Sequence, residues 1–296
     1  MHIARLLLPL VLLGACALDT GEDTQDVTGE AGHGAPEPKM NQDKDAHGHG
    51  GGGGGGSVLL AWGGGEVLHS NKTQAIFWGS QWNTGSFAGD KISGIDTFFG
   101  GFGSSNYAGL STEYSDASGN VTASSSYLGH VVDTSTPPNK ALTVNGAVAE
   151  ACKITSNNPD PNGVYFIYTA TGAGHVSYCA WHSWGNCSNG APIQVAYMPN
   201  LDGIAGCDPG DTSTGHSEGL AAIANVTAHE LSEAITDPRG TGWTDSSGAE
   251  NGDKCAWTFT GNVTLKNGSK WMLQQEWSNN AYNASQGSPR GCLQGQ

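Results

Sequence analysis

The chain has 296 residues and a formal net charge of −15 at pH 7, which makes nucleic acid and anionic lipid headgroups poor partners and a cation a better one. Only 13% of the residues are charged while 46 are glycine, and this composition does not suit a coiled coil or a helical bundle. We therefore expect a loop-rich domain that contains strands.

The N-terminus has the pattern of an export signal. Arg5 precedes an apolar run over residues 6–13, which is too short to span a bilayer. The run ends in Leu-Gly-Ala-Cys, which looks like a bacterial lipobox, where the signal peptide is cut before a cysteine that then carries lipid. The sequence therefore predicts a signal peptide over residues 1–15 and a membrane anchor at Cys16. An outer-membrane or cell-surface lipoprotein is expected, with simple secretion as the alternative.

Residues 16–56 are acidic, rich in glycine and almost free of large apolar side chains. Such a segment buries too little surface to offset its conformational entropy, so we expect a flexible tether. Its histidines and the glycine run at 50–56 can bind a metal ion loosely, although a solvated spacer is the simpler interpretation. The folded domain is expected over residues 57–296.

The cysteine count indicates disulfide bonds. Removing Cys16 from the seven cysteines leaves six, all within the expected domain. An even number in an exported protein favours disulfides, and the absence of a Cys-x-x-Cys pair disfavours a zinc cluster. On closeness in sequence alone, the first pair expected is Cys179 with Cys187.

Hydrophobic patterning predicts three strands and two helices. Short apolar and aromatic runs predict strands at residues 73–78, 164–168 and 193–198. Apolar residues at helical spacing predict a helix from about Phe87 to the glycines at 100 and 101, with its aromatic residues in the core. A second amphipathic helix is expected over 217–237, where Pro238 stops it. Strands before and between helices, without regular βαβ alternation, predict an α+β fold.

The second helix carries a pattern typical of metal sites, His229-Glu230-Leu231-Ser232-Glu233. His229 and Glu233 are four residues apart and leave one face of the helix, so the helix can offer both to one ion. Glu230 occupies the place of the general base in His-Glu-x-x-His zinc peptidases, where it takes a proton from metal-bound water. Zinc also accepts a carboxylate oxygen, but Glu233 in place of a second histidine makes the pattern less specific. A chance string on a helix is the alternative.

Two residues are candidates for a further ligand. Asp237 lies two helical turns beyond His229, where it can bind the ion or orient a ligand. His182 lies among aromatic residues and cysteines that can hold an imidazole rigidly, with a satisfied core histidine as the alternative. Carboxylates in the turn-rich stretch 243–255 can hold calcium, although turn chemistry explains them equally well.

Several motifs occur in one order along residues 60–260. They are Gly65-Glu66-Val67-Leu68, Thr73-Gln74-Ala75-Ile76-Phe77-Trp78-Gly79, Cys179-Ala180-Trp181-His182, Ala228-His229-Glu230-Leu231-Ser232-Glu233-Ala234 followed by Thr236-Asp237-Pro238, and the acidic segment Glu250 to Cys255. With them the chain resembles the plant EXORDIUM or phosphate-induced protein 1 family, which has bacterial members. The resemblance implies a secreted or cell-surface protein, and plant members are linked to the cell wall and growth. It also implies that the His-Glu helix is a family feature, but it defines no reaction. The lipobox and the His-Gly tether depart from the plant pattern and favour a bacterial surface protein.

The leading hypothesis is an exported, zincin-like single domain with a mixed sheet and an active-site helix, held by disulfides. It would be a metal-dependent hydrolase, a peptidase acting on peptide or cell-wall substrates, with zinc preferred over calcium. His229 and Glu233 would be ligands, Glu230 the base, and Asp237 or His182 a further ligand. The alternative is a non-catalytic surface or glycan-binding protein with a structural metal site, and a third possibility is an inactive descendant of a peptidase.

Overall fold

The computed structural model describes residues 40–41, 58–174 and 176–295. The predicted signal peptide, the lipidation site Cys16 and nearly all of the predicted tether lie outside the described residues, so those expectations stay predictions. Within the part that is described, no helix is long and apolar enough to cross a membrane.

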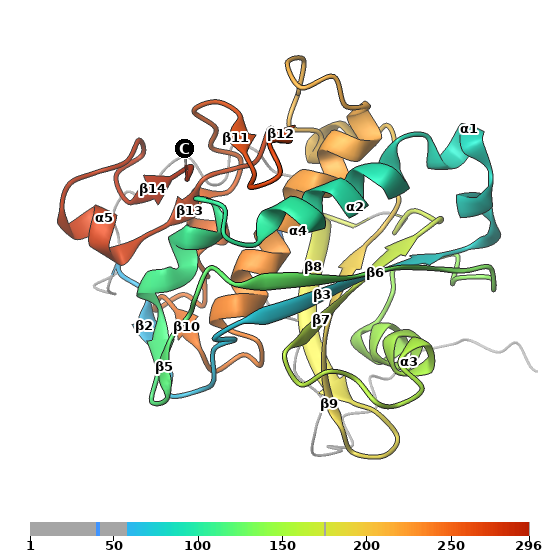
Figure 1. The fold of residues 1–296 in the computed structure, drawn as a ribbon, viewed down its shortest axis with the longest axis horizontal. Helices are drawn as coiled ribbons and strands as arrows, with labels where there is room; N and C mark the ends of the chain where they lie inside the picture. The colour runs from blue at the N-terminus through green and yellow to red at the C-terminus, as the bar shows by residue number, and fades with distance from the viewer. Residues whose placement is uncertain (1–39, 42–57, 175, 296) are drawn as a thin grey trace, which may run out of the picture. The chain divides into compact units, whose positions relative to one another are not determined.

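A six-stranded mixed sheet organises the domain, with the order β1-β8-β9-β7-β3-β6 (Figure 1). Its strands are β1 (Met40–Asn41), β3 (Asn71–Trp78), β6 (Ser125–Asp133), β7 (Gly163–Thr169), β8 (Tyr178–Asn186) and β9 (Pro192–Met198). β9, β7, β3 and β6 are parallel, β8 is antiparallel to β9, and β1 is antiparallel to β8. The predicted α+β class with a mixed sheet is confirmed.

Five helices and four small two-stranded sheets complete the described fold. The helices are α1 (Gly85–Ala88), α2 (Lys91–Phe102), α3 (Val144–Ile154), α4 (Glu218–Thr236) and α5 (Asn279–Asn283). The small sheets pair β2 (Ala61–Trp62) with β10 (Trp243–Thr244), β4 (Ser115–Asp116) with β5 (Gly119–Asn120), β11 (Val263–Thr264) with β12 (Lys270–Trp271), and β13 (Glu276–Trp277) with β14 (Cys292–Leu293). Short 3-10 turns lie at Ser80–Asn83, Ala108–Glu113, Ala205–Cys207 and Asp253–Cys255.

The central strands are buried on both faces, because helices cover both sides of the sheet. Successive side chains of a strand point to opposite faces. Ala75 and Phe77 of β3 therefore belong to the larger hydrophobic cluster, which contains α2 and α4, whereas Ile76 packs in the smaller cluster with α3. In β7 the same alternation separates Phe166 from Ile167. Figure 1 shows α2 crossing over α4 on one side and α3 on the other.

Each predicted strand and helix has an observed counterpart, with one break in the first helix. The expected helix from Phe87 is divided, because Gly89 adopts φ 53° and a new helix starts at Lys91. It then runs through Gly101, where an added Cβ would lie 2.3 Å from the Asn267 amide oxygen. β6, β8 and α3 were not predicted from the sequence. β6 contains many small and polar residues, and α3 is a short helix rich in alanine.

Three disulfides connect the six cysteines of the domain, as the even count predicts. They are Cys152–Cys187, Cys179–Cys207 and Cys255–Cys292. The expected pair Cys179–Cys187 is wrong. Cys179 packs in the cluster with α4, whereas Cys187 packs in the cluster with α3 on the opposite side of the sheet, so closeness in sequence does not bring them together.

The close approach of α2 to α4 depends on Gly94. A Cβ at this position would lie 2.3 Å from Leu220 Cδ2 and 3.0 Å from its Cγ, and Leu220 is buried. We expect Gly94→Ala to destabilise the protein by about 1–3 kcal/mol, because the packed leucine must move. Urea denaturation measures this as a lower midpoint. Gly100→Ala is the control in the same helix: no atom lies within 4 Å of its Cβ, so it should stabilise by up to about 1 kcal/mol. Equal effects of the two variants would contradict the packing argument.

Candidate metal centre

The centre is built on α4, a helix without a solvent-exposed side. Ser217 caps its N-terminus, with its hydroxyl accepting a hydrogen bond from the backbone N–H of Leu220. All residues from Gly219 to Thr236 are buried. The helix nevertheless carries His229, Glu230 and Glu233. Since buried polar groups need partners, these side chains must find them inside the protein.

The two residues of α4 that were predicted as ligands lie next to each other. His229 Nε2 lies 3.1 Å from Glu233 Oε1 across one helical turn. A loop over residues 250–253 lies against this pair, and its Asp253 places Oδ1 3.8 Å from His229 Nε2. The backbone N–H of Asp253 also donates to Glu233 Oε1 at 3.0 Å. The loop approaches closely because Gly252 has no side chain: a Cβ there would lie 2.8 Å from His229 Nδ1 and 2.9 Å from Glu233 Oε1.

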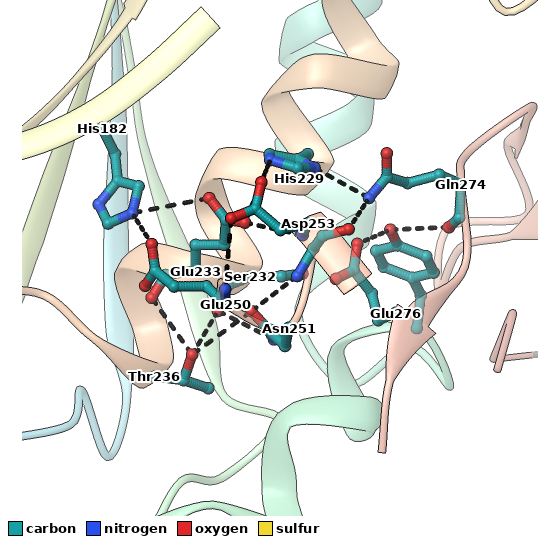
Figure 2. A network of polar contacts seen from close by, with 12 residues as sticks. His182, His229, Ser232, Glu233, Thr236, Glu250, Asn251, Asp253, Gln274 and Glu276 are labelled. Atoms are coloured by element: carbon teal, nitrogen blue, oxygen red, sulfur yellow. Dashed lines mark hydrogen bonds and ion pairs between the residues drawn. The ribbon is translucent and has the colours of Figure 1, made fainter. Parts of the chain in front are cut away.

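His182 reaches the same place from the sheet. It belongs to β8, where it pairs with Ala196 of β9, a residue on the α4 side of the sheet. Its Nε2 lies 3.0 Å from Glu250 Oε2 and 3.7 Å from Glu233 Oε2 (Figure 2). The structure thus brings His182 to the site together with a carboxylate from the 250–253 loop.

Six side chains form what we call the carboxylate–histidine cluster: His182, His229, Glu230, Glu233, Glu250 and Asp253. Two groups of three within it have ligand atoms that all lie within 4.8 Å of one another, namely His182 with Glu230 and Glu233, and His229 with Glu233 and Asp253. Glu230 therefore lies where it can donate an oxygen to an ion, a role that the sequence pattern did not indicate.

The cluster is closed to solvent. Five of its six side chains have no exposed surface, and the sixth, Asp253, is 9% exposed. Among the described residues, neither His229 Nε2 nor Glu233 Oε2 has a hydrogen-bond partner, although both are buried. Imidazole nitrogens and carboxylate oxygens are ligands of zinc and other divalent ions, and a cation between them would satisfy these atoms. The side chains present therefore fit a divalent metal ion.

A further layer of polar residues supports the cluster. The Gln274 side-chain N–H group lies 2.9 Å from both His229 Nδ1 and the carbonyl oxygen of Gly252. The Gly252 carbonyl can only accept, so the Gln274 atom next to it must be the amide nitrogen. This nitrogen also donates to His229 Nδ1. Nδ1 is therefore the acceptor, and the ring proton of His229 lies on Nε2. Next to it, Tyr107 donates to Glu276 Oε1 at 2.7 Å. Burial raises the pKa of Glu276 well above its usual value, so this carboxyl favours its neutral form.

Burial also shifts the pKa values of the cluster. Desolvation raises the pKa of Glu233 from 4.5 to about 8 and that of Asp253 from 3.8 to about 7. Desolvation lowers the pKa of His229 from 6.5 to about 4. Without a cation, the site therefore favours neutral side chains.

Asp237, expected to be a ligand or to orient one, lies at the end of α4 and is in neither group of ligand atoms. Its Oδ1 accepts hydrogen bonds from the backbone N–H groups of Thr241 and Gly242, at 2.7 Å each. Its observed role is to hold the turn after the helix. Asp245 of the suggested calcium stretch likewise accepts backbone hydrogen bonds within its own turn and pairs with Lys254 at 2.8 Å.

Sequence reasoning did not identify Gln274, Glu276 or Tyr107 as part of the site. No local pattern marks them, because they reach the cluster only through the packing of the C-terminal segment. Glu250 and Asp253 stand in the sequence as carboxylates of a turn-rich stretch and of the acidic family motif, and neither pattern places them at the helix. Their closeness to Cys255 was a further signal, since a disulfide that fixes this cysteine also fixes the loop before it.

Comparison with known proteins returned no matching family model, no matching curated protein and no matching solved structure. The resemblance to the EXORDIUM family therefore rests on the motifs quoted above.

The pKa values predict how the stability of metal-free protein depends on pH. Between pH 6.5 and about 8, folded Glu233 retains a proton that the unfolded chain has released, so stability falls as pH rises. Asp253 acts in the same direction up to about pH 7. Below pH 6.5, His229 opposes this trend, because unfolding lets it take up a proton. We expect the melting temperature of chelator-treated protein to decrease from pH 6.5 to 8. An increase over that range would contradict the assignment.

Proposed function

We propose that this protein is an exported metalloprotein in which the carboxylate–histidine cluster binds divalent metal, with zinc as the preferred ion. The observation that carries the proposal is the convergence of two histidines and four carboxylates in a site with almost no exposed surface. Buried ionised carboxylates are costly unless a positive charge accompanies them, and a cation supplies that charge. Histidine nitrogens among the donors favour zinc over calcium, which prefers oxygen alone.

The burial of the site favours a structural role for the metal. Structural zinc sites are enclosed by protein ligands, whereas catalytic sites keep one position open to water or substrate. Here the ligands come from β8, α4 and the 250–253 loop, so bound metal would join three segments distant in sequence. Three disulfides fit the same picture of a protein built for an extracellular environment.

Removal of Glu233 tests this proposal. Elemental analysis of purified protein should find zinc bound to wild type, and Glu233→Gln should abolish binding, because Glu233 belongs to both groups of ligand atoms. Chelation should lower the melting temperature of wild type by several degrees, and added zinc should restore it. Glu218→Gln is the matched control, an exposed glutamate on the first turn of the same helix, and should bind as wild type does. Metal-free wild type that gains no stability from added zinc would refute the proposal.

A second candidate function is a metal-dependent hydrolase, a peptidase in particular. Two observations favour it. Asp253, the one cluster member with exposed surface, lies on the loop that covers His229 and Glu233, so movement of this loop would open the site. The outer edge of β8 accepts an extended segment antiparallel to it, since Met40 of β1 pairs there with Ala180, two residues from His182. A peptide substrate would pair with the same edge by taking the place of β1.

The hydrolase candidate has its own test. Zinc-loaded wild type should cleave members of a peptide library, and Glu230→Gln should lower the rate at least about a hundredfold, since it removes either the general base or a ligand of the ion. Glu218→Gln should retain full activity. A zinc-loaded protein that cleaves no peptide would leave the structural role as the function of the metal.

The glycan-binding alternative has less support, because a stacking platform needs exposed aromatic residues. Among the tryptophans that the structure describes, only Trp62 is exposed, at 41%.

A further inference from the structure

The two carboxylate oxygens of Glu233 face two different histidines. Oε1 lies 3.1 Å from Nε2 of His229, which is on the same helix, and Oε2 lies 3.7 Å from Nε2 of His182, which comes from β8. Figure 2 shows the two imidazoles on opposite sides of this carboxylate. A carboxylate placed in this way can give one oxygen to each of two ions.

Each oxygen has its own set of further donors. His182 faces Oε2 and is grouped with Glu230, whereas His229 faces Oε1 and is grouped with Asp253. The two histidines belong to different groups, and Glu233 is the member that the groups share. Each group thus offers one nitrogen and two carboxylates, which is the number of protein ligands that a zinc ion commonly takes in an incomplete shell.

The charge of the cluster points to two ions. Its four carboxylates carry a charge of −4 when ionised, and its two imidazoles are neutral when they act as ligands. One divalent ion would match two of these charges, whereas two divalent ions match all four. Two of the buried atoms without a hydrogen-bond partner agree with this count. His229 Nε2 belongs to one group, and Glu233 Oε2 faces the histidine of the other group.

We infer that the centre binds two divalent ions, bridged by Glu233, with one ion at His182 and Glu230 and the other at His229 and Asp253. Ions that share a carboxylate in this way lie about 3.5–4 Å apart. The inference rests on the proposed metal binding and specifies its stoichiometry and ligands. It holds for a structural centre and for a hydrolytic one.

The two ions should bind with different affinities. Gln274 donates to His229 Nδ1 and so keeps the ring proton on Nε2, where the second ion must bind. That ion has to displace the proton from Nε2, so the imidazole then carries its proton on Nδ1. A metal-ligating imidazole donates this other N–H to an acceptor, so the Gln274 amide has to turn its oxygen toward Nδ1. At His182 the neighbour of Nε2 is the Glu250 carboxylate at 3.0 Å, which an ion can bind together with the nitrogen, so no amide has to turn. The His182 side should therefore fill first.

Cobalt(II) titration of the metal-free full chain tests the inference. Equilibrium dialysis with elemental analysis at pH 8 should give two ions per chain at saturation, in a tighter and a weaker step. Electron paramagnetic resonance should show the signal of the first cobalt change through magnetic coupling as the second binds across Glu233. Asp253→Asn should reduce the stoichiometry from two to one and remove the coupling, and Glu218→Gln should behave as wild type.

The outcomes separate this inference from the proposed function. One ion per chain at saturating cobalt would overturn the two-ion centre and leave metal binding intact. Two magnetically independent ions would overturn the bridge. No bound ion would refute both, whereas two coupled ions without hydrolysis would support the inference and exclude only the hydrolase. Wild-type stoichiometry and coupling decide the question even if Asp253→Asn fails to fold.

Discussion

A helix that is buried on every side and still carries ionisable side chains is the constraint on which the rest of the structure depends. α4 hides all residues from Gly219 to Thr236, so His229, Glu230 and Glu233 cannot reach bulk water. The surrounding segments must therefore supply partners that a surface helix would obtain from solvent. β8 contributes His182, and the C-terminal third of the described chain contributes the remaining groups.

The C-terminal segments are held against the helix by several independent contacts. The Cys255–Cys292 disulfide ties the end of the 250–253 loop to β14. Asn225 of α4 accepts a hydrogen bond from the backbone N–H of Gln274, so the residue that orients His229 is itself attached to the same helix. The loop reaches the imidazole and the carboxylate only because position 252 is a glycine. The disulfide, the Asn225–Gln274 hydrogen bond and the glycine at 252 thus determine both where the polar groups of the centre lie and which of them contact each other.

Burial has opposite consequences for binding and for catalysis. It strengthens the attraction between a cation and the carboxylates, since the surrounding dielectric constant is low. It also keeps substrate away from any bound ion. A cluster in which five of six members have no exposed surface is well arranged to hold metal, and it needs movement of the 250–253 loop before it can act on a peptide. This distinction is why the binding proposal stands ahead of the hydrolytic one.

Sequence alone determined the features that follow from local periodicity and from counting. The spacing of His229 and Glu233 on one helix face follows from 3.6 residues per turn, and the strands follow from runs of β-branched and aromatic residues. An even number of cysteines correctly indicated disulfides, but their pairing depends on which side of the sheet each cysteine occupies. Only the tertiary structure decided that His182 faces α4, that Glu250 and Asp253 lie over the helix, and that Asp237 holds a turn instead of joining the cluster. These relations join residues far apart in sequence through the strand order of a sheet and the path of a loop, and no local pattern encodes such contacts.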